Sequence, residues 1–240
     1  MLKPSFNTTL NYSPNFDVKR RKLSQIKFII FHYTGMQKEK DAINRLTDIK
    51  AKVSSHYLIK NNGEIITLVP DVYVSWHAGI SCWKNYSFIN KYSIGIEISN
   101  PGHSHEYKKF SKKQINSILK LSKFLIKKYK INSKFILGHS DISPHRKIDP
   151  GEKFPWKELS THSLGKWYGE DFDYLGDSFK KIDILFFKNL KKLGYRYFST
   201  TKRKTTDKKV IRSFQRHYLP NKVTGKIDKK TLKISHFLTH

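Results

Sequence analysis

Short hydrophobic runs separated by polar turns dominate the first 140 residues, and their length predicts strands. The predicted strands cover residues 26–31, 53–60, 64–69, 93–99 and 135–137. The run at 26–31 is interrupted only by Lys27, which is typical of a buried central strand. Asn61-Asn62-Gly63 lies between the second and third runs and indicates a hairpin.

Hydrophobic residues at helical spacing predict helices between these strands. The hydrophobic face expected for residues 38–51 carries Ile43, Leu46 and Ile49. Residues 111–130 form the clearest helical pattern, because Ser111 and Gln114 make a capping-box pair at its start. The side chains expected to be buried along that helix are Ile115, Ile118, Leu119, Leu125, Ile126 and Tyr129.

A further short helix is expected to begin at Pro155-Trp156. Strands that alternate with helices predict an α/β fold with a central mixed β-sheet flanked by helices. Residues 76–92 fit neither pattern and are rich in aromatic and polar side chains. A loop of this length inside a compact domain indicates either a functional segment or poor order.

Beyond residue 161 the pattern becomes polar and then wholly helical. Three helical patterns occupy about 178–193, 206–219 and 229–238, bounded by Gly194, Pro220 and Asp228. These limits divide the chain into an N-terminal arm at 1–24, an α/β domain at 25–161, a linker at 162–177 and a small three-helix module at 178–240. The acidic residues of the linker, which are Glu170, Asp171, Asp173 and Asp177, lack the spacing of a calcium-binding loop and fit a solvated linker.

The composition is strongly basic, with 47 Lys and Arg residues against 19 Asp and Glu, which gives a net charge of +28. Such a charge favours polyanions, including nucleic acids and acidic wall polymers. Because the lysines are scattered over polar helix faces, a solvated basic surface is the preferred interpretation, and specific nucleic-acid binding is not expected. The single cysteine, Cys82, excludes an internal disulfide.

No hydrophobic stretch approaches the roughly 18 residues that a membrane span requires, so no transmembrane segment is expected. Residues 1–22 lack a hydrophobic signal core and a cysteine for a lipid anchor, and export is therefore not supported by the visible sequence.

The stretch HSDISPHRKIDPG at 139–151 is the strongest candidate for chemistry. His139 and Asp149 lie in one irregular loop after a predicted strand, and His32 directly follows another. Two imidazoles and one carboxylate suit zinc, and three protein ligands leave a fourth position for water. A histidine at a strand end is, on its own, more often structural.

A carbonyl hydrolase also needs a base and a positive group near the developing oxyanion. Glu97 lies on an otherwise hydrophobic strand, where burial would raise its pKa toward the working range of a base; alternatively it faces solvent on an edge strand. Lys147, two residues before Asp149, can reach a carbonyl oxygen from the same loop, but among so many lysines it can equally be a solvated charge.

Several motifs carry a resemblance to a known family over residues 12–160. They are SPN at 13–15, FIIFHYTG at 28–35, VSSHYLIKNNGEI at 53–65, VSWHAG at 74–79, SIGIEI at 93–98, GHSDISPHRKIDPG at 138–151 and FPW at 154–156. Together they resemble the zinc-dependent N-acetylmuramoyl-L-alanine amidases of the peptidoglycan-recognition-protein type. The loop at 138–151 is the most specific of them, since it has the family's His, Lys and Asp in order and spacing.

The resemblance implies one zinc ion per chain with His32, His139 and Asp149 as ligands. It also implies that Glu97 and Lys147 are the catalytic pair. The aspartate ligand points to the bacterial branch, which includes the cytoplasmic recycling amidase and the envelope-bound amidase with a wall-binding module.

Other positions are weaker candidates for substrate contacts. His77 resembles a residue at the rim of the family's groove, and Arg146 suits an acidic stem peptide or lactyl group. The aromatic residues Trp76, Trp83 and Tyr86 can stack on sugar or belong to the core. His56 matches a family histidine, although its strand position favours packing equally. His145 departs from the small residue usual at its position.

The last 60 residues resemble the three-helix peptidoglycan-binding module. VIRSFQRHY at 210–218 resembles its VxxFQ helix, and TGKID at 224–228 resembles the turn before its last helix. These motifs are short, and helical packing also explains Val210, Phe214 and Tyr218.

The sequence therefore predicts a monomeric zinc hydrolase that cuts the amide bond between N-acetylmuramic acid, or its anhydro form, and L-alanine in peptidoglycan or muropeptides. The alternative is a non-catalytic peptidoglycan-binding protein. The wall-binding module favours the cell envelope or periplasm, whereas the missing signal favours the cytoplasm.

Overall fold

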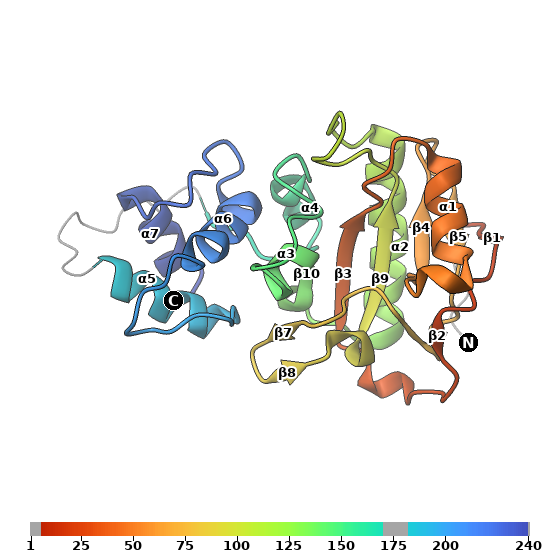
Figure 1. The fold of residues 1–240 in the computed structure, drawn as a ribbon, viewed down its shortest axis with the longest axis horizontal. Coiled ribbons are helices and arrows are strands. Elements are labelled where there is room, and N and C mark those ends of the chain that lie inside the picture. The colour runs from red at the N-terminus through yellow and green to blue at the C-terminus, as the bar shows by residue number, and fades with distance from the viewer. Residues whose placement is uncertain (1–5, 170–181, 240) are drawn as a thin grey trace.

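A six-stranded mixed sheet forms the centre of the computed structural model, which describes residues 6–169 and 182–239 (Figure 1). Its strands are, in order across the sheet, β1 (Thr9–Leu10), β5 (Ile65–Thr67), β4 (Tyr57–Ile59), β9 (Ser93–Ile98), β3 (Phe28–Tyr33) and β10 (Ile136–Gly138). β4 and β5 pair antiparallel, whereas β4, β9, β3 and β10 run parallel to one another. The predicted mixed α/β fold is confirmed.

The predicted hairpin joins β4 to β5, with Ile59 opposite Ile65. Gly63 closes the turn with a φ of +86°, a conformation that costs glycine little. A Cβ at this position would also lie 2.8 Å from the backbone oxygen of Lys113. The turn therefore tolerates only glycine, for two independent reasons.

The continuous hydrophobic run of β3 reflects burial on both faces of the sheet. Ile29 and Phe31 pack with helix α2 (Lys112–Tyr129), which covers one face. Phe28 and Ile30 belong to a second cluster on the opposite face. His32 follows Phe28 and Ile30 in the strand alternation, so it projects from the second of these two faces.

The helix predicted at 38–51 ends four residues earlier than expected. Helix α1 covers Glu39–Thr47, and a separate 3₁₀ turn follows at Ile49–Ala51. Asp48 is extended and its side chain accepts a hydrogen bond from the backbone N–H of Lys50, which ends the helical phase. Ile49 is consequently 66% exposed instead of sharing the buried face.

Helix α2 begins with the predicted capping box between Ser111 and Gln114. Its buried stripe is shifted from the prediction, since Leu121 is fully buried with Ile118 and Leu125. The other predicted stripe residues, which are Ile115, Leu119, Ile126 and Tyr129, lie partly buried at its border.

The remaining short elements frame the sheet. β2 (Phe16–Asp17) pairs with β6 (Val74–Ser75), and β7 (Cys82–Trp83) pairs with β8 (Tyr86–Ser87) inside the loop predicted at 76–92. Further 3₁₀ turns cover Leu23–Gln25, Ile89–Tyr92 and Ser133–Phe135. Helix α3 (His139–Ile142) follows β10 directly, and α4 (Trp156–Thr161) begins where expected.

Three helices, α5 (Ile182–Leu193), α6 (Asp207–Tyr218) and α7 (Lys229–Phe237), form the C-terminal part and group beside α3 and α4 (Figure 1). They share one hydrophobic cluster with the sheet, in which Phe28 and Leu137 join Phe186, Leu190 and Phe214. The C-terminal helices therefore pack beside the β10 edge of the sheet, next to α3 and α4 (Figure 1).

The first half of the predicted linker is packed against the rest of the protein. Leu164 is fully buried in the cluster beneath α2, and Trp167 packs partly buried against the same cluster. Leu164 is therefore part of the core, whereas His162, Ser163 and Gly169 are exposed. The remainder of the predicted linker, with its four acidic residues, lies outside the described residues, as does the start of the helix expected at 178. No helix within 6–169 and 182–239 has the length and hydropathy to cross a membrane.

Candidate active site

The site is assembled where parallel strands end at one edge of the sheet. His32 on β3 lies directly opposite Glu97 on β9 in the strand register, so both side chains project from the same face. His139 follows the end of β10, which pairs with β3 on its other side. Functional side chains gather at the carboxyl ends of parallel strands in α/β folds, and the strand order here accounts for that convergence.

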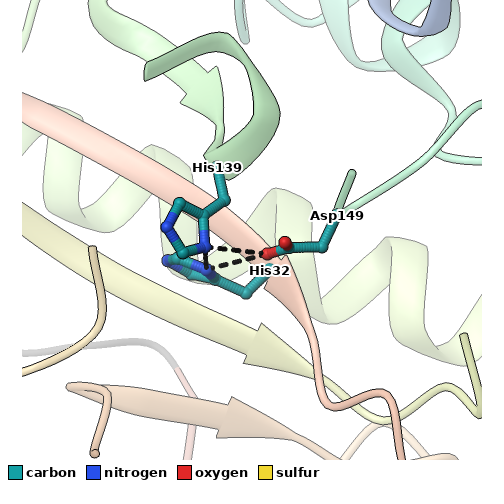
Figure 2. Close-up of side chains that lie close together, drawn as sticks. All are labelled: His32, His139 and Asp149. Atoms are coloured by element: carbon teal, nitrogen blue, oxygen red, sulfur yellow. Dashed lines mark hydrogen bonds and ion pairs between the residues drawn. The ribbon is translucent and has the colours of Figure 1, made fainter. Parts of the chain in front are cut away.

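Three ligand atoms converge at this edge (Figure 2). His32 Nδ1 lies 3.0 Å from His139 Nδ1 and 3.0 Å from Asp149 Oδ2. His139 Nδ1 lies 3.1 Å from the same Oδ2 atom. All three side chains are buried. The structure thus brings together the three residues predicted as metal ligands.

A chain of hydrogen bonds fixes the tautomer of His32. The Ser93 hydroxyl donates to the carbonyl of Ile89 at 2.7 Å, so Ser93 Oγ accepts from His77 Nε2 at 2.9 Å. His77 Nδ1 then carries no proton and accepts from His32 Nε2 at 2.9 Å. His32 Nδ1 is therefore left with a free lone pair directed toward the other ligand atoms.

His139 is oriented in the same way from a different loop. Its Nε2 lies 3.1 Å from the carbonyl oxygen of Ala78, which can only accept, so Nε2 carries the proton. Its Nδ1 also presents a lone pair. Two bare imidazole nitrogens and one carboxylate oxygen facing each other repel unless a cation lies between them, and this donor set fits a zinc ion.

The ionisation of the ligands agrees with this arrangement. Burial, and then the neighbouring His139, lower the pKa of His32 to about 4, so its ring is neutral at neutral pH. Burial alone would raise the pKa of Asp149, but the adjacent His139 and His32 hold that pKa below its usual value. A metal requires neutral imidazoles and an ionised carboxylate, and these are the forms favoured for His32 and Asp149.

Glu97 lies beside the ligands and is largely shielded from solvent. Its Oε2 atom is buried and has no hydrogen bond within the described part of the chain. Burial, followed by the charge of Asp149, raises the pKa of Glu97 to about 8, while Lys147 acts in the opposite direction. A carboxyl with a pKa in this range can both accept and return a proton near neutral pH.

These side chains line a cavity of about 340 Å³. The predicted site residues in its wall are His32, His139, Asp149, Glu97, Lys147, Trp76, His77 and Arg146. Other wall residues include Tyr33, Thr34 and Ser104. A cavity of this size lies at the small end of the range for small-molecule sites.

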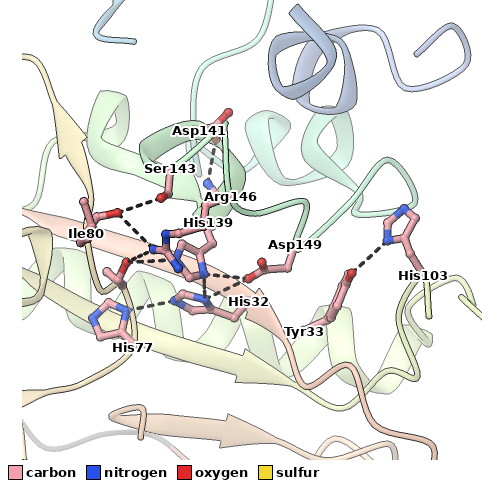
Figure 3. A network of polar contacts seen from close by, with 12 residues as sticks. His32, Tyr33, His77, Ile80, His103, His139, Asp141, Ser143, Arg146 and Asp149 are labelled. Atoms are coloured by element: carbon pink, nitrogen blue, oxygen red, sulfur yellow. Dashed lines mark hydrogen bonds and ion pairs between the residues drawn. The ribbon is translucent and has the colours of Figure 1, made fainter. Parts of the chain in front are cut away.

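Arg146 is exposed and braces the loop that carries Ala78 (Figure 3). Its Nη2 donates to the carbonyls of Ala78 at 3.0 Å and Ile80 at 3.1 Å. The hydroxyl of Ser143 donates to the same Ile80 carbonyl at 2.8 Å. Arg146 therefore lies in the wall and also links the two loops that surround His139.

His56 is not among the residues that line the cavity, so the geometry does not support the substrate contact expected for it. It is fully buried, and its Nδ1 accepts from the backbone N–H of Gly95 at 3.0 Å. Its Nε2 lies 2.8 Å from Arg21 Nη2. The strand position therefore gives His56 a packing and hydrogen-bonding role in the interior.

The other aromatic and histidine candidates differ in whether they line the cavity. Trp76 lines the cavity, and its Nε1 donates to Asp17 Oδ1 at 2.7 Å. Trp83 is buried against Tyr195, with ring centroids 4.8 Å apart, and belongs to the core. His145 lies outside the cavity wall, with its ring 4.5 Å from that of Tyr197.

Two residues that support the site were missed by the sequence interpretation. Ser93 begins the chain of hydrogen bonds to His32. Gly95 leaves room for the His77 ring, because a Cβ at position 95 would lie 2.4 Å from that ring. The signal was a glycine inside a hydrophobic strand, which often marks a close approach by another group.

Comparison with known proteins identifies the family. The N-acetylmuramoyl-L-alanine amidase family matches residues 22–152. N-acetylmuramoyl-L-alanine amidase AmiD of Escherichia coli is 34% identical over 233 residues, which cover 89% of this chain and 82% of AmiD. The 1,6-anhydro-N-acetylmuramyl-L-alanine amidase AmpD of Haemophilus influenzae is 34% identical over 163 residues, or 60% of this chain and 86% of AmpD.

A solved structure agrees over nearly the whole chain. AmiD of E. coli, in complex with the substrate anhydro-N-acetylmuramic acid-L-Ala-D-γ-Glu-L-Lys, superimposes with a TM-score of 0.80 at 30% identity. The match covers 92% of this chain and 91% of that one. The family resemblance, the fold class and the enzyme class predicted from the sequence are confirmed. This chain belongs to the N-acetylmuramoyl-L-alanine amidase family and is an amide hydrolase of that family.

Proposed function

We propose that this enzyme hydrolyses the bond between N-acetylmuramic acid and L-alanine with one zinc ion held by His32, His139 and Asp149. The observation that carries the proposal is the convergence of three buried acceptor atoms, all within 3.0–3.1 Å of one another, beside Glu97, whose buried Oε2 atom has no hydrogen bond within residues 6–169 and 182–239. When bound there, zinc would supply a Lewis acid that polarises the substrate carbonyl and lowers the pKa of a water molecule.

Glu97 is proposed as the general base and acid. With its pKa raised to about 8, its carboxylate can take a proton from the attacking water and still release it to the departing nitrogen of L-alanine. Its position opposite His32 in the strand register supports this role, because it lies next to the proposed metal ligands.

Lys147 is proposed as the positive group that stabilises the developing oxyanion. It is half-buried in the cavity wall, and its charge lowers the pKa of both Glu97 and His32. An ammonium fixed in a partly dehydrated cavity stabilises an oxyanion far more than a solvated one does.

The substrate is proposed to be a muropeptide or peptidoglycan strand, with the anhydro form accepted. Support comes from the AmiD complex with an anhydro-muropeptide and from the name of AmpD. Arg146 is exposed at the cavity and suits an acidic stem residue, and Trp76 presents an aromatic ring. His77 is proposed to orient His32, which its two hydrogen bonds support better than substrate contact.

The C-terminal helices are proposed to bind peptidoglycan, with the protein acting as a monomer in the cell envelope; the cytoplasm is the alternative. The two motifs of this part are joined through Gln215, whose side chain accepts from the N–H of Gly225 at 2.7 Å and donates to the carbonyl of Lys226 at 2.8 Å. The buried glutamine of VxxFQ therefore holds the TGK turn, which supports the module assignment as a fold.

The test is digestion of anhydro-N-acetylmuramic acid-L-Ala-D-γ-Glu-L-Lys, with mass spectrometry for the free stem peptide and metal analysis of the same sample. Release of the peptide at one zinc per chain, lost in His139→Ala, is the expected result. Zinc-loaded protein that binds the muropeptide without releasing peptide would instead favour a non-catalytic peptidoglycan-binding protein.

A further inference from the structure

Helix α6 lies along the loop that carries two of the three proposed ligands. Ser213 Oγ donates to the carbonyl of Ser140 at 2.7 Å, and His217 Nδ1 lies 2.8 Å from Asp141 Oδ2. Arg216 Nε lies 3.6 Å from Glu152 Oε2. These contacts fall just after His139 and just after Asp149, so one helix holds both ends of the ligand loop.

Asp141 is the centre of this contact. It is 1% exposed and lies two residues beyond His139 (Figure 3). Oδ2 accepts from the backbone N–H of Gly138 and from His217 Nδ1, both at 2.8 Å, and Oδ1 accepts from the Tyr195 hydroxyl. A buried carboxylate needs donors of this kind, and Tyr195 and His217, in the C-terminal part, supply two of the three.

The two donors are themselves held by packing. The His217 ring stacks on Trp156 at 3.9 Å and 12° and on Tyr218 at 4.0 Å and 13°. The Tyr195 ring packs on Trp83. Because both rings are buried with defined neighbours, neither donor can turn away from Asp141 without disturbing the core.

We propose that Tyr195 and His217 are positioning residues for the metal centre, acting through Asp141 on the loop that holds His139. The C-terminal helices then complete the active site in addition to any contact with the wall. This inference rests on the proposed zinc site. Its physical basis is that partners outside the ligand shell set the orientation of the ligands and, through it, the affinity for the metal.

The variants Tyr195→Phe and His217→Phe, alone and together, remove the two C-terminal donors to Asp141. Phenylalanine preserves both aromatic contacts of His217, and the His217 Nε2 atom that it also removes has no hydrogen bond within the described residues. Ser235→Ala is the matched control, because it deletes a buried hydrogen bond of 3.0 Å from Asn189, between α5 and α7, away from the loop.

Zinc affinity is measured in the full-length chain by competition with a chelator, together with kcat, KM and the thermal midpoint. The double variant is expected to bind zinc about tenfold more weakly and to lose kcat with KM nearly unchanged, by analogy with other partners outside the ligand shell. Ser235→Ala is expected to lower the thermal midpoint without changing zinc affinity.

Equal zinc affinity in the parent and the double variant would overturn the inference while leaving the proposed function intact. An equal loss of zinc affinity in Ser235→Ala would also overturn it, because the effect would then follow general stability. If the parent itself bound no zinc, the proposed function would fail first and the inference with it.

Discussion

The Nδ1 atoms of His32 and His139 lie 3.0 Å apart, although 107 positions separate the two residues in the chain. Each ring donates its only proton away from the other, His32 toward His77 and His139 toward the carbonyl of Ala78. The fold therefore holds two lone pairs face to face. Removing the metal should cost stability for this reason.

Metal removal is the first test of that relationship. Free zinc at a hundredfold excess over its Kd should raise the free energy of unfolding by about 2.7 kcal/mol, because only the folded chain assembles the ligands. Thermal unfolding with zinc and with a chelator measures the difference. His139→Ala should show no difference between the two conditions, and a zinc-dependent shift that survives in this variant would argue against the site.

Glu97→Gln should separate catalysis from metal binding. The amide cannot take the proton of water, so kcat should fall by about 10²-fold or more. Zinc content should stay at the parental level, because Glu97 is not among the three ligand atoms. Peptide release by mass spectrometry and metal analysis check both parts. Retained activity would remove Glu97 from the mechanism.

The raised pKa of Glu97 also predicts a pH dependence of stability in the metal-free protein. Its pKa rises from an ordinary 4.5 to about 8 on folding, so the folded state favours the protonated form. The contribution of Glu97 is full below pH 4.5 and is lost as the pH rises through 8. Urea unfolding between these values should show a steeper decline in the parent than in Glu97→Gln. The same pH dependence of stability in the parent and in Glu97→Gln would contradict the raised pKa of Glu97.

Ser93→Ala should weaken zinc binding although Ser93 touches no ligand. Without the hydroxyl, His77 is free to adopt the other tautomer and His32 loses its fixed acceptor. A loss of about tenfold in zinc affinity is expected. Ser122→Ala is the matched control, because Ser122 is equally buried on α2 and its hydroxyl has no partner within the described residues. Equal affinities in the two variants would exclude this role for Ser93.

Gly95→Ala should destabilise the protein through His77. The added Cβ would lie 2.4 Å from the ring, so the strand or the ring must move, at a cost of about 1–3 kcal/mol in the free energy of unfolding. Urea unfolding measures this cost. Gly169→Ala, where the nearest contact is 3.3 Å to the end of the Phe237 ring, should change little. An unchanged free energy of unfolding in Gly95→Ala would show that the strand and the His77 ring can move apart at little cost.

The sequence predicted most of the sheet and the three proposed ligands, because each lies in a short motif with its own local signal. His32 directly follows a hydrophobic run, and the loop at 139–151 has distinctive spacing. Local patterns carry no information on which residues support them from a distance. The roles of Ser93 and Asp141 depend on contacts with residues far along the chain. Ile49 was misassigned because the side chain of Asp48 interrupts the helical phase.

The hydrophobic cluster that Phe28 and Leu137 share with Phe186, Leu190 and Phe214 has a consequence for how the protein unfolds. A chain cut after α4 would expose the sheet residues of this cluster to water, and the severed helices would expose the rest. The two parts should therefore unfold in a single cooperative transition.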